Sequence, residues 1–286
     1  MHYVDYGGPS QAPLLVMVHG LGGSLVNWAA LAPLLHDHVR VVAVDLAGFG
    51  RTEGGHRSTS VHANQRLLHR FLTEVVAEPV VLVGNSMGGL ISAMQTARHP
   101  ETVTGLVLID PALPIAPAAR PDPLVAVTFG AFAVPAVGRW MLGRRRSRLS
   151  AEQAAYETLR LCCVDPSRVP RPVVEQHIEL ARHRRELPDV DAELLAAARS
   201  LMWVIARRRT YDEMLASIRV PVLLLHGEKD RLVPLRAARR TAAANPRWTF
   251  AVGPDLGHVP QLEDAGWTAA HLLEWLPVAV RDQQLG

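Results

Sequence analysis

Cysteine is nearly absent from this sequence, and the two cysteines present are neighbours. Only Cys162 and Cys163 occur among the 286 residues. A disulfide between adjacent residues encloses almost no chain, so it would stabilise the fold very little. The cysteine content therefore excludes a stabilising disulfide and predicts a reduced, cytoplasmic protein.

A strong charge of one sign is also lacking. The 30 lysines and arginines exceed the 27 aspartates and glutamates only slightly, which gives a formal net charge of +3. This excess is too small to indicate a nucleic-acid partner. Arginines do cluster locally, where we expect solvated faces of helices, with an acidic partner or an anionic membrane surface as the alternative. The clustered residues are Arg144, Arg145, Arg146, Arg148, Arg182, Arg184, Arg185, Arg207, Arg208 and Arg209.

Long hydrophobic runs are missing as well. The longest apolar stretch, residues 124–137, contains Gly130 and Pro135 and is too short to span a bilayer. The N-terminal sequence MHYVDYGGPSQAP has no basic region followed by an apolar core, so no secretory signal is expected. With 49% hydrophobic and 20% charged residues, the composition is that of a soluble globular protein.

Short, continuously apolar runs bounded by glycine or charged residues recur along the chain. Continuous rather than alternating apolar character is typical of strands covered on both faces, as in a parallel sheet. The segments between the runs are long enough for helices, so the sequence predicts an α/β fold with a doubly wound, mostly parallel sheet. The expected strands are residues 14–18, 40–45, 80–84, 105–110, 220–227 and 248–252. The expected helices are residues 24–36, 59–77, 87–99, 235–244 and 262–276.

One long interval breaks this alternation. From Pro111 to about Ile218 no buried strand is recognisable, and the segments AEQAAYETLRLC, PVVEQHIELARHRREL and DAELLAAARSLMWVIARRR have the pattern of amphipathic helices. Acidic residues lie early and basic residues late in these segments, as the helix dipole favours. We therefore expect a core domain of residues 1–110 and 219–286, with residues 111–218 inserted as a helical cap over the carboxyl edge of the sheet.

The stretch VVLVGNSMGGLISAM carries a candidate nucleophile. Gly84, Ser86 and Gly88 form a G-x-S-x-G pattern between an expected buried strand and an expected helix. A serine in this context sits on a sharp turn that requires small neighbours and that lifts the hydroxyl above the sheet. The N-terminus of the following helix favours negative charge at the same place. This placement predicts that Ser86 is a nucleophile.

A serine hydroxyl needs a base and a group that orients the base. His258 lies in a glycine-containing loop after the last expected strand, which brings it to the same edge of the sheet as Ser86. Asp230 follows the preceding long strand and could accept the second imidazole N–H, which would fix the tautomer. Asp110, at the end of another strand, is the alternative acid, and we favour Asp230.

Acyl transfer also requires hydrogen-bond donors for a developing oxyanion. The glycine-rich turn in VMVHGLGGS could supply the backbone N–H of Leu21, paired with that of Met87 directly after the serine. His19 in the same turn is expected to stabilise the turn rather than to act as a second base.

Three alternative interpretations have less support. A dinucleotide-binding turn at Gly20 and Gly22 would need a third glycine where Leu25 stands, so Asp45 is expected to organise the DLAGFGRT turn instead of holding a ribose. The isolated H-D-H at residues 36–38 gives little support for a metal site, and no cofactor is expected. A ligand-binding or scaffold protein without catalysis stays an alternative, although all three triad residue types are present.

Five motifs in order resemble the α/β-hydrolase fold family. They are HGLGGS, DLAGFGRT, GNSMGG, GEKDRLVP and GHVPQLED, and they carry Ser86, Asp230 and His258 in the family's order of nucleophile, acid and histidine. The resemblance covers residues 3–110 and 219–276, and it is greatest to small bacterial esterases and lipases, including monoacylglycerol-lipase-like enzymes. A serine nucleophile departs from epoxide hydrolases and haloalkane dehalogenases, which carry aspartate there.

The GNSMGG motif also resembles that of carbon–carbon bond hydrolases of aromatic ring-cleavage pathways. Those enzymes usually have a G-P-G oxyanion loop and an aromatic residue after the histidine, whereas this chain has GLGGS and Val259. Family members usually have a further strand before the segment that resembles HYVDYG, which here begins at His2. The resemblance implies a serine hydrolase that cleaves carboxylic esters through an acyl-enzyme, with the carbon–carbon hydrolase as the alternative.

We expect the cap to select the substrate. Its apolar runs favour a small-molecule ester with an acyl chain or another apolar group. An apolar run flanked by arginines could also rest weakly on a lipid surface, whereas no feature specifies an oligomeric state. The residues expected to contact substrate are Phe129, Phe132, Trp140, Trp203 and Val259, although each could equally pack the cap onto the core.

Overall fold

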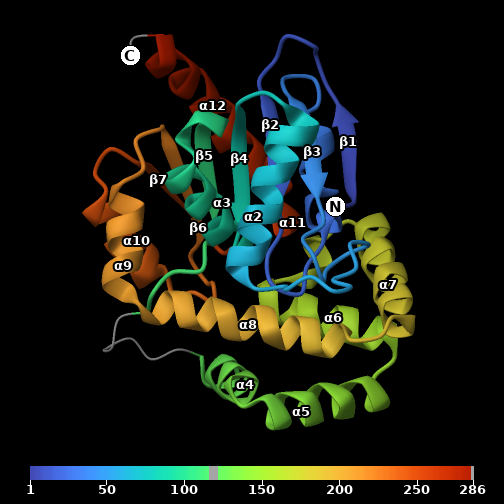
Figure 1. Cartoon of the computed structure of the whole chain (residues 1–286). Coiled ribbons are helices and arrows are strands. Elements are labelled where there is room, and N and C mark those ends of the chain that lie inside the picture. Colours follow the sequence, from blue (N-terminus) through green and yellow to red (C-terminus); the bar gives the residue numbers. More distant parts are fainter. Residues whose placement is uncertain (116–121, 285–286) are drawn as a thin grey trace.

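A seven-stranded sheet forms the centre of the molecule. The computed structural model describes residues 1–115 and 122–284 (Figure 1). The strand order is β1-β3-β2-β4-β5-β6-β7, in which every pair from β3 to β7 is parallel, whereas β1 runs antiparallel to β3. The predicted doubly wound, mostly parallel sheet is therefore confirmed. The strands are β1 (Tyr3–Gly7), β2 (Leu14–Val18), β3 (Arg40–Val44), β4 (Val80–Asn85), β5 (Val103–Ile109), β6 (Val222–Gly227) and β7 (Thr249–Gly253).

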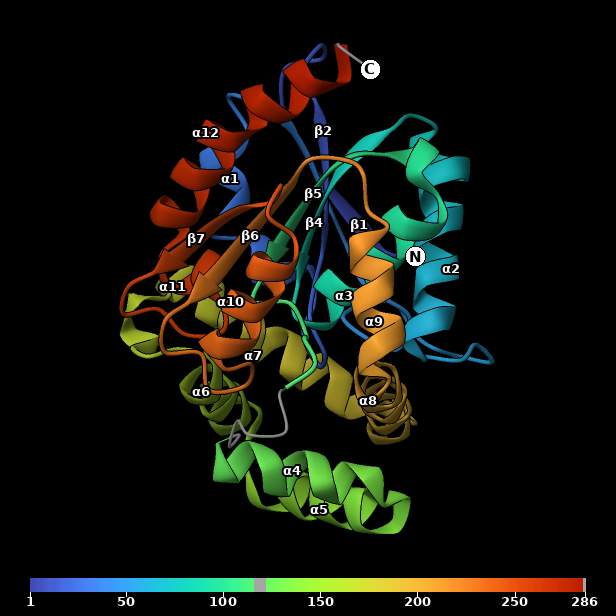
Figure 2. The same ribbon diagram turned by 90° about the vertical axis from the view of Figure 1, so that its left-hand side faces the viewer.

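Both faces of the sheet are buried, which explains the continuous apolar runs. In β2, Leu14, Val16 and Val18 belong to one hydrophobic cluster, while Leu15 and Met17 belong to another. The first cluster includes residues of α2, α3, α9 and α10, and the second includes residues of α1 and α12. Figure 2 shows α1 and α12 on one side of the sheet and α2 and α9 on the other. These helices are α1 (Ala32–Leu35), α2 (Val61–Phe71), α3 (Met87–Arg98), α9 (Arg208–Ala216), α10 (Leu235–Ala244) and α12 (Ala265–Gln284).

The six expected strands are present, and β1 is an edge strand that the apolar pattern did not reveal. Its residues alternate between exposed and half-buried, because an edge strand of this kind is covered on one side only. The expected helix at residues 24–36 is instead a 3₁₀ turn, η1 (Leu25–Trp28), followed by the short α1. The expected helix at residues 59–77 divides into α2 and a π-helical turn, η2 (Leu72–Val76).

Between β5 and β6 the described part of the chain is helical, with connecting loops. We call residues 122–218 the cap segment. Figure 1 shows α4, α5, α6 and α8 gathered beyond the edge at which the parallel strands end. No single helix among the described residues is long and apolar enough to cross a bilayer, and α4 with α5 reaches that length and composition only as a pair bent by 119°. The cap helices before α9 are α4 (Pro123–Ala133), α5 (Pro135–Arg148), α6 (Ala151–Cys162), α7 (Arg171–Glu186) and α8 (Val190–Ala206).

Polar contacts tie α7 and α8 to loops of the core. Arg184 donates to the carbonyl oxygens of Gly48 and Gly50 at 2.6 and 3.1 Å. Glu193 accepts the backbone N–H of Gly54 at 2.9 Å. The expectation that Arg184 lies on a solvated helix face is wrong, because its side chain is only 15% exposed and satisfies two loop carbonyls.

Candidate active site

Ser86 occupies the turn between β4 and α3, at the carboxyl edge of the sheet. Its backbone has φ 54° and ψ −119°, a conformation that residues other than glycine rarely adopt. A Cβ at Gly84 would lie 2.5 Å from the carbonyl oxygen of Gly88, and a Cβ at Gly88 would lie 2.1 Å from that of Val18. The two glycines therefore let β4, α3 and β2 approach closely enough to hold Ser86 in this strained turn, with its side chain half-buried.

His258 and Asp230 lie in the loops after β7 and β6 and are hydrogen-bonded to each other. The distance between His258 Nδ1 and Asp230 Oδ2 is 2.7 Å, and both side chains are buried. The backbone N–H groups of Leu232 and Val233 donate to Asp230 Oδ1 at 2.7 and 3.1 Å. Burial alone would raise the pKa of Asp230, but His258 and the amides outweigh it and hold the pKa below its usual range. An anionic Asp230 accepts the proton of His258 Nδ1, so Nε2 is the ring nitrogen that could act as a base.

Asn85 joins the turn of Ser86 to the loop that carries His258, residues 254–259, which we call the histidine loop. Its Nδ2 donates to the carbonyl oxygens of Ile109 and His258, both at 3.0 Å. Asn85 directly precedes Ser86, so this bond brings the turn of Ser86 and the His258 loop together, although 173 residues separate Asn85 from His258. Asn85 was not predicted as a site residue, although a polar residue at the end of an otherwise apolar strand is visible in the sequence.

Asp110, the alternative acid, contacts His226 rather than His258 in the described structure. Asp110 Oδ1 accepts the backbone N–H of Gly227 at 2.9 Å and lies 3.3 Å from His226 Nδ1. His226 Nε2 lies 2.9 Å from the carbonyl oxygen of Val233, so Nε2 carries the proton and Nδ1 is an acceptor. Burial and the charge of Asp230 raise the pKa of Asp110 well above its usual range. A neutral Asp110 can share its proton with His226, which leaves Asp230 as the charged partner of His258.

Asp110, His226 and Asp230 are also the described residues whose geometry could hold a metal ion. One ligand atom from each lies within 4.8 Å of the others, and all three residues are buried. Asp230 already accepts hydrogen bonds from His258 and from two amides, so a cation here would compete with the contact that orients His258. The group is better explained as a hydrogen-bonded network behind the histidine.

The backbone N–H groups of Leu21 and Met87 are the candidate donors for an oxyanion at Ser86. Met87 is the first residue of α3, so its N–H has no acceptor within the helix. A Cβ at Gly20 would lie 3.0 Å from the Cβ of Ser86, which places the turn that carries Leu21 against the serine. Leu21 and Met87 therefore come from the two loops that an oxyanion-binding pair would need.

His19 and Asp45 hold the turns around Leu21. His19 is buried; its Nδ1–H donates to the carbonyl oxygen of Gly20 at 2.8 Å, and its Nε2 accepts the N–H of Leu46 at 3.0 Å. Burial lowers the pKa of His19, so the ring is neutral and both nitrogens are in use. Asp45 accepts the N–H of Leu25 at 2.8 Å and, within the DLAGFGRT turn, the N–H of Arg51 at 2.9 Å. Both residues therefore have the turn-stabilising contacts that the sequence predicted.

Three of the residues expected to contact substrate are buried or half-buried. Phe132 belongs to a buried cluster of the cap segment against which Leu21 packs. Phe129 lies edge-on to Phe132, with ring centroids 6.0 Å apart. Val259, next to His258, is buried among side chains of α6 and α7. The contact of these three residues with substrate stays a prediction.

The two tryptophans expected at the substrate site lie on the surface of the cap segment. Trp140 is 64% exposed and Trp203 is 53% exposed. The guanidinium of Arg144 lies 5.6 Å from the ring centre of Trp140, and that of Arg207 lies 3.1 Å from the ring centre of Trp203. Their contact with substrate also stays a prediction, and each ring already has a cationic partner.

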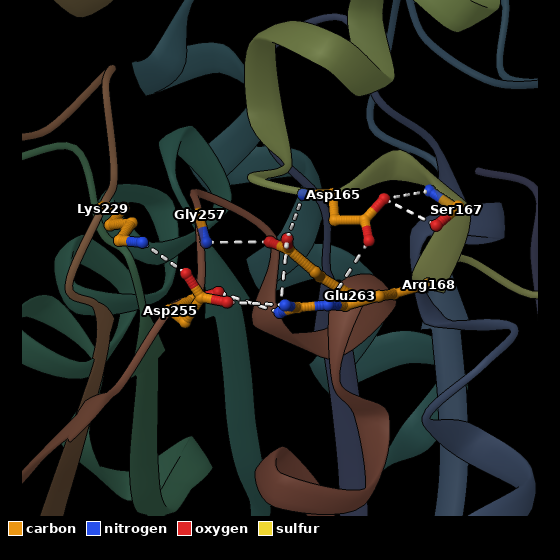
Figure 3. Close-up of polar contacts among 7 residues, drawn as sticks. All are labelled: Asp165, Ser167, Arg168, Lys229, Asp255, Gly257 and Glu263. Carbon is orange, nitrogen blue, oxygen red and sulfur yellow. Dashed lines mark hydrogen bonds and ion pairs between the residues drawn. The ribbon is translucent and has the colours of Figure 1, made fainter.

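A polar cluster that the sequence analysis missed joins the cap segment to the histidine loop (Figure 3). The Glu263 side chain is fully buried and accepts the backbone N–H groups of Asp165 and Gly257 at 2.7 and 2.8 Å. Glu263 stands in the same GHVPQLED motif as His258, so a carboxylate in an otherwise mostly apolar helix start was the available signal.

Comparison with known proteins identifies the family. Residues 13–265 match a family model described as the alpha/beta hydrolase fold. The chain belongs to the α/β-hydrolase fold family. This α/β-hydrolase is 28% identical over 267 residues to the dihydrolipoyllysine-residue acetyltransferase component of the acetoin cleaving system of Cupriavidus necator. That match covers 93% of the chain but only 63% of the relative, so the chain spans less than two thirds of the relative's length.

Other relatives of this α/β-hydrolase match over most of their length. It is 31% identical over 268 residues to the 2-hydroxy-6-oxo-2,4-heptadienoate hydrolase of Pseudomonas putida, covering 92% of the chain and 87% of the relative. The solved structure of a thermophilic esterase from Thermogutta terrifontis is similar with a TM-score of 0.71 and 25% identity, covering 97% and 93% of the two chains. These relatives support the interpretation that this chain is a hydrolase.

Proposed function

We propose that this protein is a serine hydrolase that cleaves carboxylic esters of apolar acyl groups. The observation that carries the proposal is the strained turn of Ser86, which Asn85 ties to the loop of His258, together with the hydrogen bond between His258 and an anionic Asp230. These three residues lie at one edge of the sheet, in the order nucleophile, acid and base along the chain. Membership of the α/β-hydrolase fold family and similarity to an esterase support the proposal.

In this mechanism Ser86 Oγ attacks the ester carbonyl carbon while His258 Nε2 takes its proton. The backbone N–H groups of Leu21 and Met87 stabilise the negative oxygen of the tetrahedral intermediate. His258 then protonates the leaving alcohol, and the acyl group stays on Ser86. Water, deprotonated by His258, attacks the acyl-enzyme and releases the acid product.

The cap segment would select the acyl group. Phe132 belongs to the buried cap cluster against which Leu21 packs, and Val259 directly follows His258 in the chain. Apolar side chains in these positions favour an aliphatic or aromatic acyl group over a charged one.

The alternative chemistry is hydrolysis of a carbon–carbon bond in a ring-cleavage product. The 31% identity to a 2-hydroxy-6-oxo-2,4-heptadienoate hydrolase favours this candidate. The same serine, histidine and aspartate can serve both reactions, so substrate turnover distinguishes them.

A panel of p-nitrophenyl esters of graded acyl length, assayed beside a dienone ring-cleavage substrate, tests the proposal. We expect kcat/KM for the esters to rise by about fourfold for each added methylene until the pocket is filled, because each methylene buries further apolar surface. Turnover of the dienone alone would establish the alternative instead. Inactivity of the folded protein towards both substrate classes would favour a ligand-binding role.

We further propose that α4 and α5 dock weakly on an anionic membrane surface. Residues 123–138 contain no charged side chain, yet Leu124 and Val127 are 58% and 67% exposed. Residues 139–148 carry five arginines and no acid. An exposed apolar helix surface followed by cations is suited to the headgroup region of anionic lipid, with Trp140 at the boundary.

Co-sedimentation with phosphatidylcholine vesicles, with and without phosphatidylserine, tests this docking. We expect binding to require phosphatidylserine, to weaken with salt, and to fall by about fivefold when Arg144 is replaced by glutamine. Trp140→Ala should weaken binding too, whereas Trp203→Ala, at an exposed tryptophan of α8, is the matched control and should not. Binding that is indifferent to anionic lipid would contradict the proposal.

A further inference from the structure

Glu263 connects two backbone segments that belong to different parts of the fold. It is the last residue of α11 (Pro260–Glu263), and its side chain is inaccessible to solvent. Oε1 accepts the N–H of Asp165 in the cap segment, and Oε2 accepts the N–H of Gly257, the residue before His258. Both carboxylate oxygens therefore have backbone donors, one in the cap segment and one in the histidine loop (Figure 3).

A second backbone contact joins the same two segments. The N–H of His258 donates to the carbonyl oxygen of Cys162 at 2.6 Å. A Cβ at Gly257 would lie 2.3 Å from that oxygen, so the chain passes too closely for any side chain at this position. Residues 162–168, which we call the cap strap, thus lie directly on the histidine loop.

Ion pairs extend this contact to the loop that carries Asp230, residues 228–234, which we call the acid loop. Arg168 of the cap strap donates to Asp255 at 2.6 Å, and Lys229 pairs with the same carboxylate (Figure 3). Lys229 and Arg168 lower the pKa of Asp255 to about 2, so this carboxylate is anionic at neutral pH. Asp255 lies in the histidine loop and Lys229 directly precedes Asp230. One cluster therefore joins the cap strap, the histidine loop and the acid loop.

We propose that Glu263 and the cap strap position His258 for proton transfer, so that the cap segment governs the base as well as the substrate. This inference rests on the proposed serine chemistry. Glu263 is a positioning residue, because it acts through the backbone of Gly257 and His258. Displacement of a reacting group by about 1 Å can lower a rate by about 10²-fold, so two short backbone contacts beside His258 are sufficient for a large effect.

The variant Glu263→Gln keeps the side-chain volume but replaces one acceptor oxygen with an NH₂ donor. That donor must face the N–H of Asp165 or of Gly257, which removes one backbone contact. We expect kcat to fall by about 10- to 100-fold while KM changes by less than about twofold.

The rate at which a fluorophosphonate labels Ser86 is expected to fall in parallel with kcat. Labelling forms the bond between Ser86 Oγ and phosphorus, breaks the phosphorus–fluorine bond, releases fluoride and passes the serine proton to His258. It therefore reports on the base without depending on the ester that the cap segment prefers.

A surface variant tests the same connection without disturbing the interior. Arg168→Gln removes the ion pair with Asp255 and is expected to lower kcat by up to about fivefold, with recovery in Arg168→Lys. Arg171→Gln is the matched control, because Arg171 is exposed on the same part of the cap segment and, among residues 1–115 and 122–284, pairs only with the nearby Glu175. Its kcat and KM should equal those of the wild type.

The downfield proton resonance of His258 Nδ1–H gives a further readout that needs no substrate. We expect this resonance to shift or broaden in Glu263→Gln and to stay unchanged in Arg171→Gln. A folded Glu263→Gln variant with wild-type kcat, labelling rate and resonance would overturn the positioning role. A wild-type protein that resists fluorophosphonate would overturn the serine chemistry instead, while the resonance would still test whether Glu263 orients His258.

Discussion

Replacement of Ser86 by alanine is expected to lower kcat for ester hydrolysis by about 10⁶-fold. The substitution removes the only oxygen that can form the proposed acyl-enzyme, while the backbone N–H groups of Leu21 and Met87 stay in place. The remaining rate should be a residual one from oxyanion stabilisation and substrate binding. KM should change little, and the stopped-flow burst of p-nitrophenol that we expect from the wild type should be absent.

Ser92→Ala is the matched control for this experiment. Ser92 is buried in α3, and its hydroxyl has no hydrogen-bond partner in the described structure. Its removal should leave ester turnover at the wild-type level. Turnover that survives in Ser86→Ala, at a rate above that of a contaminating esterase in a mock preparation, would eliminate the proposed nucleophile.

Asp230→Asn is expected to lower kcat by about 10⁴-fold. An asparagine retains the shape of the side chain but cannot act as an anion, so His258 loses the charge that fixes its tautomer and stabilises its protonated form. The equivalent change at Asp110 should keep kcat within about fivefold of the wild type, because asparagine is close in shape and charge to the protonated acid that burial enforces there. Steady-state kinetics and urea unfolding of both variants measure these effects.

The two aspartates therefore serve as controls for each other. A loss of about 10⁴-fold in Asp110→Asn, with activity retained in Asp230→Asn, would show that Asp110, directly after β5, supplies the negative charge instead of Asp230. Equal losses in both variants would show that His226 and the two carboxyl groups act as one unit, since residues that act together give non-additive effects.

The edge of the sheet that carries the site could be predicted from the sequence. Ser86, Asp230 and His258 each follow a strand of continuous apolar residues, and parallel strands deliver their carboxyl ends to the same edge. The hydrogen bond between His258 and Asp230 is consistent with that argument. The same argument could not predict β1, because an edge strand with one covered side has no continuous apolar run.

The contacts that support the site could not be predicted, because they depend on distances between segments that are far apart in the sequence. Nothing in the neighbourhood of Glu263 indicates that its carboxylate meets Asp165, 98 residues away. The burial of Arg184 against Gly48 and Gly50 follows from the position of α7 on the core. The amphipathic pattern of α7 does not determine that position. The neutral state of Asp110 likewise depends on the proximity of Asp230 in space.

The cap segment separates β5 from β6 in the chain, so these two neighbouring strands can pair only after the long segment between them is closed. Leu106 pairs with Val222 across the whole helical segment, and closing so long a loop costs chain entropy before the new contacts offset it. Ser86 precedes this closure, whereas Asp230 and His258 follow it. A nascent chain that has folded only its first five strands would therefore carry the proposed nucleophile without its proposed acid and base, and we expect hydrolysis to recover during refolding only once β5 has paired with β6.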